Sequence, residues 1–304
     1  MKRILPFPAL LVLAGCAHPA PGPTIDPSLS GMIPADTIVL AGTRVEALER
    51  TPVYQKYIAK RSIPQIDRFA EETRIDPRKD LWELLYVSNG KQSALLGRGK
   101  ISDESEPRIG SKGATRFGYG GVNFVGDEQR AIMLVSPTVA GIGDTAELKA
   151  MVDARDQSPG PPPALAALLK DMPAGAQFWT AYSGGPIGLP FPEAGNLSNL
   201  NQIVQSIQSG SFYLDLRTGL NGLAVGNTAT EQAAKDLEGG LKALIALGRL
   251  STPSNQPDLQ RVWDGIRVTQ QDRQVKLYLN EPEELVEKFV ELTVGRVPAP
   301  PKSQ

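Results

Sequence analysis

Cysteine and histidine are almost absent from this chain: its 304 residues contain one of each, Cys16 and His18. A single cysteine excludes an internal disulfide and a thiolate metal cluster. No histidine follows His18, which excludes Ser-His-Asp and Cys-His catalytic groups and imidazole metal sites from the rest of the chain. We therefore expect no metal or other cofactor, and no enzyme of these classes.

The chain also lacks a basic excess and a long apolar run. It has 32 Lys and Arg against 33 Asp and Glu, a net charge of −1, which argues against nucleic acid as a partner. No stretch approaches the roughly 20 apolar residues that span a bilayer as a helix. The nucleophile-elbow and phosphate-loop motifs are missing, and the glycines of 97–100 and 118–121 lack phosphate-loop spacing, which favours turns.

Carboxylates are the remaining candidates for catalysis. One acidic group lies in the polar stretch 103–106, and a second, Glu281, Glu283 and Glu284, opens a predicted helix. The helix dipole explains acids at a helix N-terminus, and the first group lacks the ligand spacing of a calcium loop. We expect both groups to be solvated surface, which leaves an enzyme working with Asp, Glu, Lys or Ser alone as the least favoured alternative.

The first sixteen residues form a recognisable processing segment. A positive start at 1–3 precedes the apolar run 4–13, and Leu-Ala-Gly-Cys follows at 13–16. This segment resembles a bacterial lipoprotein signal peptide, with residues 13–16 as its lipobox. The resemblance implies cleavage between Gly15 and Cys16 and a covalent lipid on Cys16, so that the mature protein is exported and its partner is a membrane. Two or more acyl chains give stable anchoring.

The residues after the cysteine carry two further expectations. In the enterobacterial lipoproteins that this segment resembles, an Asp after the cysteine retains the protein at the inner membrane. Ala17 stands here, which favours the periplasmic face of the outer membrane. Residues 16–31 are rich in proline and predict an extended tether, in which His18 has no fixed partners.

The rest of the chain predicts two degenerate repeats. Residues 32–42 and 172–182 both run from Met and Pro-Ala into a strand-like segment, and the proline-rich stretch 157–163 separates the halves. We predict these boundaries: signal peptide 1–15, lipid-anchored tether 16–31, first half 32–156, Pro-rich connection 157–171, second half 172–294, disordered tail 295–304.

Turn and cap signals define the elements within each half. Asn89-Gly90 lies between two apolar alternating runs and predicts a hairpin. Asp144 with Glu147, and Thr228 with Glu231, have capping-box spacing at two helix starts, and an apolar-periodic stretch at 197–207 predicts another helix. The sequence therefore predicts an α+β fold, largely antiparallel sheet with helices packed on one face. The Pro-Ala-Asp-Thr opening at 34–37 and the repeated hairpin-to-helix units resemble exported bacterial proteins without an assigned activity.

A glycine- and proline-rich loop at 182–195 is the candidate contact for a ligand or partner, because it presents Ile187, Leu189 and Phe191 after a strand. Burial of these side chains against a sheet edge is the alternative. The favoured hypothesis is a membrane-anchored, non-enzymatic α+β module that contacts envelope proteins. The alternative is a carrier or binder of lipids or other apolar ligands, which requires a continuous apolar cavity.

Overall fold

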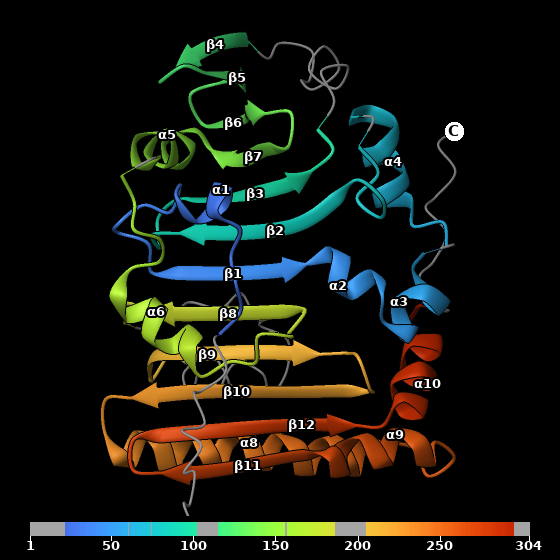
Figure 1. The fold of residues 1–304 in the computed structure, drawn as a ribbon. Coiled ribbons are helices and arrows are strands. Elements are labelled where there is room, and N and C mark those ends of the chain that lie inside the picture. The colour runs from blue at the N-terminus through green and yellow to red at the C-terminus, as the bar shows by residue number, and fades with distance from the viewer. Residues whose placement is uncertain are drawn as a thin grey trace, which may run out of the picture.

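One antiparallel sheet of twelve strands forms the molecule (Figure 1). The computed structural model describes residues 22–59, 61–73, 75–101, 115–155, 157–185 and 205–294. The strand order is β11-β12-β10-β9-β8-β1-β2-β3-β7-β6-β5-β4. The strands are β1 (Val39–Arg44), β2 (Leu81–Ser88), β3 (Ser93–Gly99), β4 (Thr115–Tyr119), β5 (Val122–Gly126), β6 (Arg130–Ser136), β7 (Val139–Asp144), β8 (Phe178–Ser183), β9 (Ile207–Asp215), β10 (Leu220–Thr228), β11 (Ile266–Gln271) and β12 (Gln274–Glu281).

Helices occur in groups between runs of antiparallel strands, which fits the predicted α+β class. None of the described helices is long and apolar enough to cross a membrane. The helices are α1 (Pro27–Ser30), α2 (Val45–Glu49), α3 (Pro52–Tyr57), α4 (Pro64–Thr73), α5 (Thr145–Ala154), α6 (Pro163–Lys170), α8 (Glu231–Ser251), α9 (Pro257–Val262), the 3-10 turn η3 (Trp263–Gly265) and α10 (Glu283–Val294).

The two predicted halves meet at the centre of the sheet, where β1 pairs with β8. Outward from this seam the first half runs β1-β2-β3-β7-β6 and the second runs β8-β9-β10-β12-β11. Each half thus has one strand at the seam, then a hairpin, then a later hairpin. The second strand of the later hairpin pairs with the second strand of the earlier one. β4 and β5 have no counterpart in the second half. The duplication remains a prediction, and the similar strand order of the two halves is consistent with it.

The main core lies on one face of the sheet. There α1, α5 and α6 cover the central strands and those of the first half, with Leu29, Met151 and Leu165 packed against side chains such as Leu40 and Leu96. All five side chains are buried. Since the cluster includes β1 and β8, a single core spans the seam between the halves.

Helix α8 packs on the opposite face, over β10, β11 and β12 (Figure 1). Its Ala234 and Leu237 lie against Val268 and Val275. Sheet register explains the reversal, because the apolar residues of these end strands stand on the opposite face from Leu40 and Leu96. The expectation of helices on one face therefore holds for α1, α5 and α6, while α8 departs from it.

Two predicted linkers are partly structured. The tether prediction is wrong for residues 22–31, where Leu29 of α1 is fully buried and Ile25 packs on the core. The Pro-rich connection contains α6, which starts at Pro163 because proline suits the first helical turn. Leu165 and Leu169 then lie on one face of this helix and enter the core. Both corrections have one cause: apolar residues in a proline-rich segment can still be buried against the rest of the protein.

Local signals located the elements well, although their details differ. The Asn89-Gly90 hairpin joins β2 to β3 through a four-residue loop, since Ser88 pairs with Ser93. Helix α8 is capped by Thr230, whose hydroxyl accepts a hydrogen bond from the Ala233 amide at 3.1 Å, two residues later than expected. Asp144 precedes α5 but its carboxylate accepts from the Ser93 amide at 2.7 Å.

Candidate functional site

An apolar groove lies between α8 and the sheet, and pairing register explains why it exists. Tyr182, Gly210, Gly226 and Val275 form one cross-strand row through β8, β9, β10 and β12. Paired residues of adjacent strands share a face, so the two central positions present only backbone beneath the helix. Glycine inside a strand often marks such a close approach.

The neighbouring row supplies the apolar walls. Thr180, Phe212, Ala224 and Leu277 are paired in sequence across the same strands. Leu237 and Leu241 of α8, with Ile207, complete a groove of about 420 Å³. That volume lies within the range of roughly 300–1,000 Å³ that is usual for small-molecule sites.

The glycines are sterically required at one of the two positions. A β-carbon on residue 210 would lie 2.6 Å from the Val225 carbonyl oxygen, which is backbone and cannot yield. At Gly226 the nearest atom would be Ile207 Cδ1 at 3.3 Å, a side chain that can adjust. The hollow is therefore built into the backbone of β9 and reinforced at β10.

Among the described residues that line the groove none is charged, and the polar side chains are hydroxyls such as Thr180 and Tyr182. Tyr182 is buried, and this burial raises the pKa of its phenol. The lining therefore offers neither a general base nor a metal ligand at neutral pH. It can hold an apolar group, because burial of each CH₂ contributes about 0.8 kcal/mol.

The row of paired side chains that contains Thr180 continues beyond the part of the sheet that α8 covers. From Thr180 the same register passes through Ala41, Tyr86, Leu95 and Ile142 on β1, β2, β3 and β7. Tyr86 and Ile142 are exposed large apolar side chains. The groove thus opens onto an apolar track that crosses the first half of the sheet on the same face.

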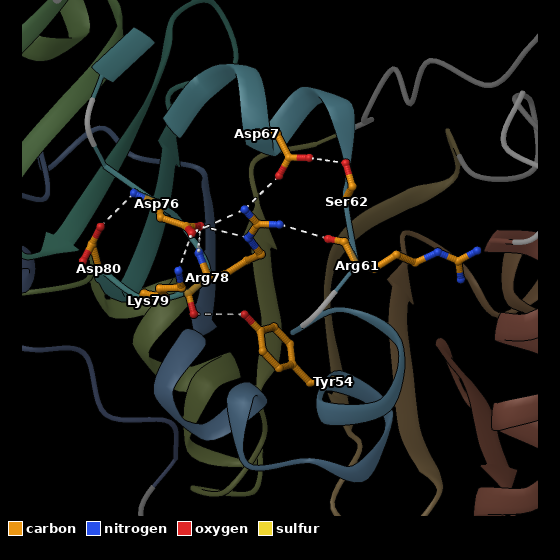
Figure 2. A network of polar contacts seen from close by, with 8 residues as sticks. All are labelled: Tyr54, Arg61, Ser62, Asp67, Asp76, Arg78, Lys79 and Asp80. Atoms are coloured by element: carbon orange, nitrogen blue, oxygen red, sulfur yellow. Dashed lines mark hydrogen bonds and ion pairs between the residues drawn. The ribbon is translucent and has the colours of Figure 1, made fainter. Parts of the chain in front are cut away.

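The acidic side chains with shifted pKa values lie outside the groove and take part in structural contacts. Figure 2 shows one polar network, centred on Arg78. Its guanidinium lies 2.8 Å from Asp67 and 2.9 Å from Asp76, and it donates to the Arg61 carbonyl. Burial alone would raise the pKa of Asp76, but hydrogen bonds and the charge of Arg78 outweigh it and lower that pKa. The network joins α4 to the turn before β2.

Glu147 is a buried carboxylate with one unpartnered oxygen. Its side chain in α5 is fully buried, and its Oε1 atom has no hydrogen-bond partner. Its Oε2 atom accepts from Asn89 Nδ2 at 3.2 Å, and the same amide group lies 3.3 Å from Asp36. Burial, together with the negative charges of Asp36 and Asp144, raises the pKa of Glu147 to about 7.

A third cluster ties the N-terminal segment to the sheet. Arg98 Nε lies 3.3 Å from Asp26 Oδ2 and 3.6 Å from Glu83 Oε2, and its guanidinium stacks on Trp82. The Asp26 amide donates to Glu83 Oε1 at 3.3 Å. Burial raises the pKa of Glu83. Within the described ranges no group of three His, Cys, Asp or Glu side chains is placed to hold a metal ion.

The predicted site residues have different outcomes. Gly15, Cys16 and His18, the acidic stretch 103–106 and most of the predicted helix 197–207 lie outside the described residues, and so do Ile187, Leu189 and Phe191. Glu283 and Glu284 occupy the first turn of α10, as the dipole argument expects. Glu281 corrects the expectation of solvated surface: it ends β12, is buried against Gly265, and burial raises its pKa.

Comparison with known proteins concerns the fold. No family model and no curated protein matches the chain. Among solved structures, crystal form III of TP0453 superposes with a TM-score of 0.51 at 11% identity, over 86% of this chain and 97% of that one. The fold is similar to that of TP0453. Crystal form I of TP0453 gives a TM-score of 0.47 at 11% identity, over 88% and 98% of the two chains. The likeness to TP0453 covers both halves and carries no activity with it.

The sequence contained a partial signal for the groove. Gly210 and Gly226 interrupt strands in which apolar and polar residues otherwise alternate, and Phe212 is one of the apolar residues of such a strand. Which strand lies beside which could not be read from those residues. Only the register of β8, β9, β10 and β12 brings the two glycines together under α8.

Proposed function

We propose that this protein is an exported bacterial lipoprotein whose folded part is a non-enzymatic module that holds an apolar ligand between α8 and the sheet. The apolar groove carries the proposal, because a continuous apolar cavity is what a binder requires and a surface-display module does not. In the part of the chain that the structure describes, its walls contain no charged side chain. Binding of an apolar group in such a groove removes apolar surface from water, which lowers the free energy.

The shape of the apolar surface favours a long, narrow ligand. The roofed part has room for one chain, and the track through Ala41, Tyr86 and Leu95 lies in line with it. A polar end would lie at the open side, where solvent reaches it. The proposed ligand class is therefore an amphiphile with one long hydrocarbon chain, such as a fatty acid or a lysolipid.

Lipid anchoring at Cys16 would hold this groove close to a membrane. The described fold begins at residue 22, whose backbone contacts Leu169 at the end of α6. Five residues separate it from Cys16, and at about 3.3 Å each they reach roughly 17 Å. We propose the periplasmic face of the outer membrane as the location, on the strength of Ala17.

Lipidation has a direct test. A clickable palmitate analogue should label the wild-type protein in a bacterial host and leave the Cys16→Ser variant unlabelled. The Cys16→Ser precursor should also retain its first fifteen residues, which mass spectrometry of the intact protein would detect. Equal labelling of both proteins would exclude Cys16 as the attachment point.

The ligand proposal is tested with a dansyl-labelled fatty acid and the mature chain carrying Cys16→Ser. Ala224→Phe fills the groove between Phe212 and Leu277 and should weaken probe binding about tenfold or more. Ala243→Phe is the matched control, because it makes the same change at an exposed position of α8. Its probe affinity should equal that of the parent.

Two results would contradict the proposal: no probe fluorescence change with the parent protein, or equal affinity of Ala224→Phe and Ala243→Phe. Circular dichroism of each variant distinguishes a filled groove from a lost fold. The other candidate function, contact with an envelope protein, is favoured by a different observation, the open edge of the sheet at β11.

A further inference from the structure

Strand β11 is one end of the sheet. Within the part of the chain that the structure describes, β12 is its only neighbour. The far side of β11 therefore presents unpaired backbone N–H and C=O groups. Such an edge is a template for another extended segment unless charge, proline or a bulge protects it. The sequence of β11, Ile-Arg-Val-Thr-Gln-Gln, contains no proline, and its pairing with β12 is regular.

A second groove runs beside this edge, distinct from the one described above. Its volume is about 520 Å³, and its apolar surface comes from Ile245 and Leu250 of α8 and from Ile266 and Val268 of β11. Leu250 is 83% exposed, the highest value among the large apolar side chains, and the neighbouring Leu247 is 45% exposed. An exposed apolar surface next to an open edge is typical of a docking site.

Basic side chains stand on both faces of the sheet at this edge. On the face of α8, Lys242 and Arg249 line the edge groove, and none of the described lining residues is a carboxylate. Lys242 pairs with Glu238 at 2.8 Å and Arg249 with Asp264 at 3.0 Å, both at exposed positions where ion pairs are weak. The Arg267 guanidinium lies over the Tyr278 ring at 4.6 Å, on the sheet face away from α8. On that face Arg267 is therefore placed to pair with a carboxylate of a neighbouring strand.

We propose that this edge binds an extended acidic peptide segment of a partner protein, which adds to the sheet as a strand beside β11. Its apolar side chains would face α8 and contact Leu250 and Ile266. Its carboxylates would lie on the other face, where Arg267 forms a cross-strand ion pair. This is recognition by strand addition, in which the backbone supplies affinity and alternate side chains supply specificity.

The open backbone favours a peptide over a lipid surface. Each unpaired N–H or C=O group that entered hydrocarbon would lose its hydrogen bonds with water and gain none, which costs several kcal/mol. An extended peptide satisfies the same groups. The proposal is also independent of the ligand under α8, because the edge groove shares no lining residue with the first groove.

The test uses fluorescein-labelled six-residue peptides, the length of β11, with the mature chain carrying Cys16→Ser. The parent peptide alternates valine with glutamate, and a second alternates valine with lysine. We expect measurable anisotropy binding for the first and at least about tenfold weaker binding for the second. Arg267→Glu should reverse this preference, while Arg50→Glu, at an exposed position on α2's end, should leave it unchanged.

Backbone pairing has its own readout. Two N-methylated forms of the acidic peptide carry methyl groups on odd or on even amides. In an added strand alternate amides point toward β11, so one form should lose binding and the other should retain it. Equal behaviour of the two forms would overturn the proposal. So would an unchanged affinity in both Arg267→Glu and Leu250→Ser, the latter at a site too exposed to affect folding.

A membrane surface is the remaining outcome. If vesicles of phosphatidylglycerol bind the protein, Leu250→Ser weakens that binding and the acidic peptide does not bind, then the edge groove contacts lipid and the peptide proposal is wrong. The Ala224→Phe variant should bind the acidic peptide with the parent affinity whether or not it binds the fatty acid, which separates the failure of one proposal from that of the other.

Discussion

Gly42 shows how a single residue sets the central packing. It lies on β1 opposite Trp179 of β8, and Trp179 is among the largest fully buried side chains. A β-carbon at position 42 would overlap the indole ring. The ring therefore occupies the space that the side chain of any other residue at position 42 would need. It packs across the seam between the two halves.

Gly42→Ala should lower the free energy of unfolding by about 1–3 kcal/mol, because an extra methyl in a packed core displaces its neighbours. Gly97→Ala is the control, since its β-carbon would sit at an ordinary 3.5 Å from Leu84 Cδ2. Urea unfolding followed by tryptophan fluorescence measures both. Equal stability of the two variants would show that the core absorbs the methyl group.

Glu147 makes stability depend on pH. Its pKa in the folded protein is about 7, above the ordinary 4.5, so the folded state binds a proton that the unfolded state releases. Stability from this group is then fully present below about pH 4.5 and is lost as the pH rises toward 7. The full loss is roughly 3 kcal/mol.

Glu147→Gln should remove this loss, because the amide keeps the contact with Asn89 and stays neutral. We expect the variant to exceed the wild type in urea midpoint at pH 8 and to approach it at pH 5. Glu128→Gln, at an exposed position, serves as control. A pH profile identical in the wild type and Glu147→Gln would contradict the assignment.

Helix α1 is a four-residue element with a large share of the core. Asp26 caps it by accepting from the Ser28 amide at 2.9 Å, and Leu29 is 0% exposed. So short a helix is not stable alone. Its structure comes from docking, which also brings the segment after the proposed anchor onto the sheet.

Leu29→Ala should therefore cost about 2–4 kcal/mol of stability, as truncation of a buried leucine does. Ser30→Ala, at a half-buried position of the same helix whose hydroxyl makes only a 3.4 Å hydrogen bond to the Pro27 carbonyl, should cost little. Urea unfolding gives the comparison. A Leu29→Ala variant with wild-type stability would mean that residues 22–31 are a free tether after all.

At the scale of the whole molecule, the sheet makes the two halves one folding unit. β1 pairs with β8 along its length, and Trp179 of the second half and Leu165 of the connection share a core with Leu40 and Leu85 of the first half. Separation of the halves would expose two central strand edges and half of that core.

We expect residues 22–294 to unfold in one transition, with coincident circular dichroism and fluorescence curves. Residues 32–156 and 172–294 produced separately should aggregate or remain unfolded. Trp82 reports on the first half, and Trp179 and Trp263 on the second, so Trp→Phe variants can follow each half alone. Two separated midpoints would show that the halves are independent domains.

The sequence alone predicted what short-range chemistry controls. Asn89-Gly90 located a hairpin, the Pro-Ala segments before β1 and β8 located two strands, and capping-box spacing and an acidic first turn located the starts of α8 and α10, so the α+β class and the antiparallel sheet are confirmed. The lipobox at Cys16 is equally local and remains a prediction. Such signals act within a few residues, and one sequence displays them in full.

The tertiary structure decided everything that depends on distant partners. It placed α8 on the opposite face from α1 and α6, because register, which no local pattern states, determines the face on which Leu277 and Val275 stand. It set Gly210 beside Gly226 and so made the groove, and it buried Leu29 and Glu147 in segments that looked solvated. A residue is buried by the residues that cover it, and some of the covering residues here lie more than a hundred positions away in the sequence.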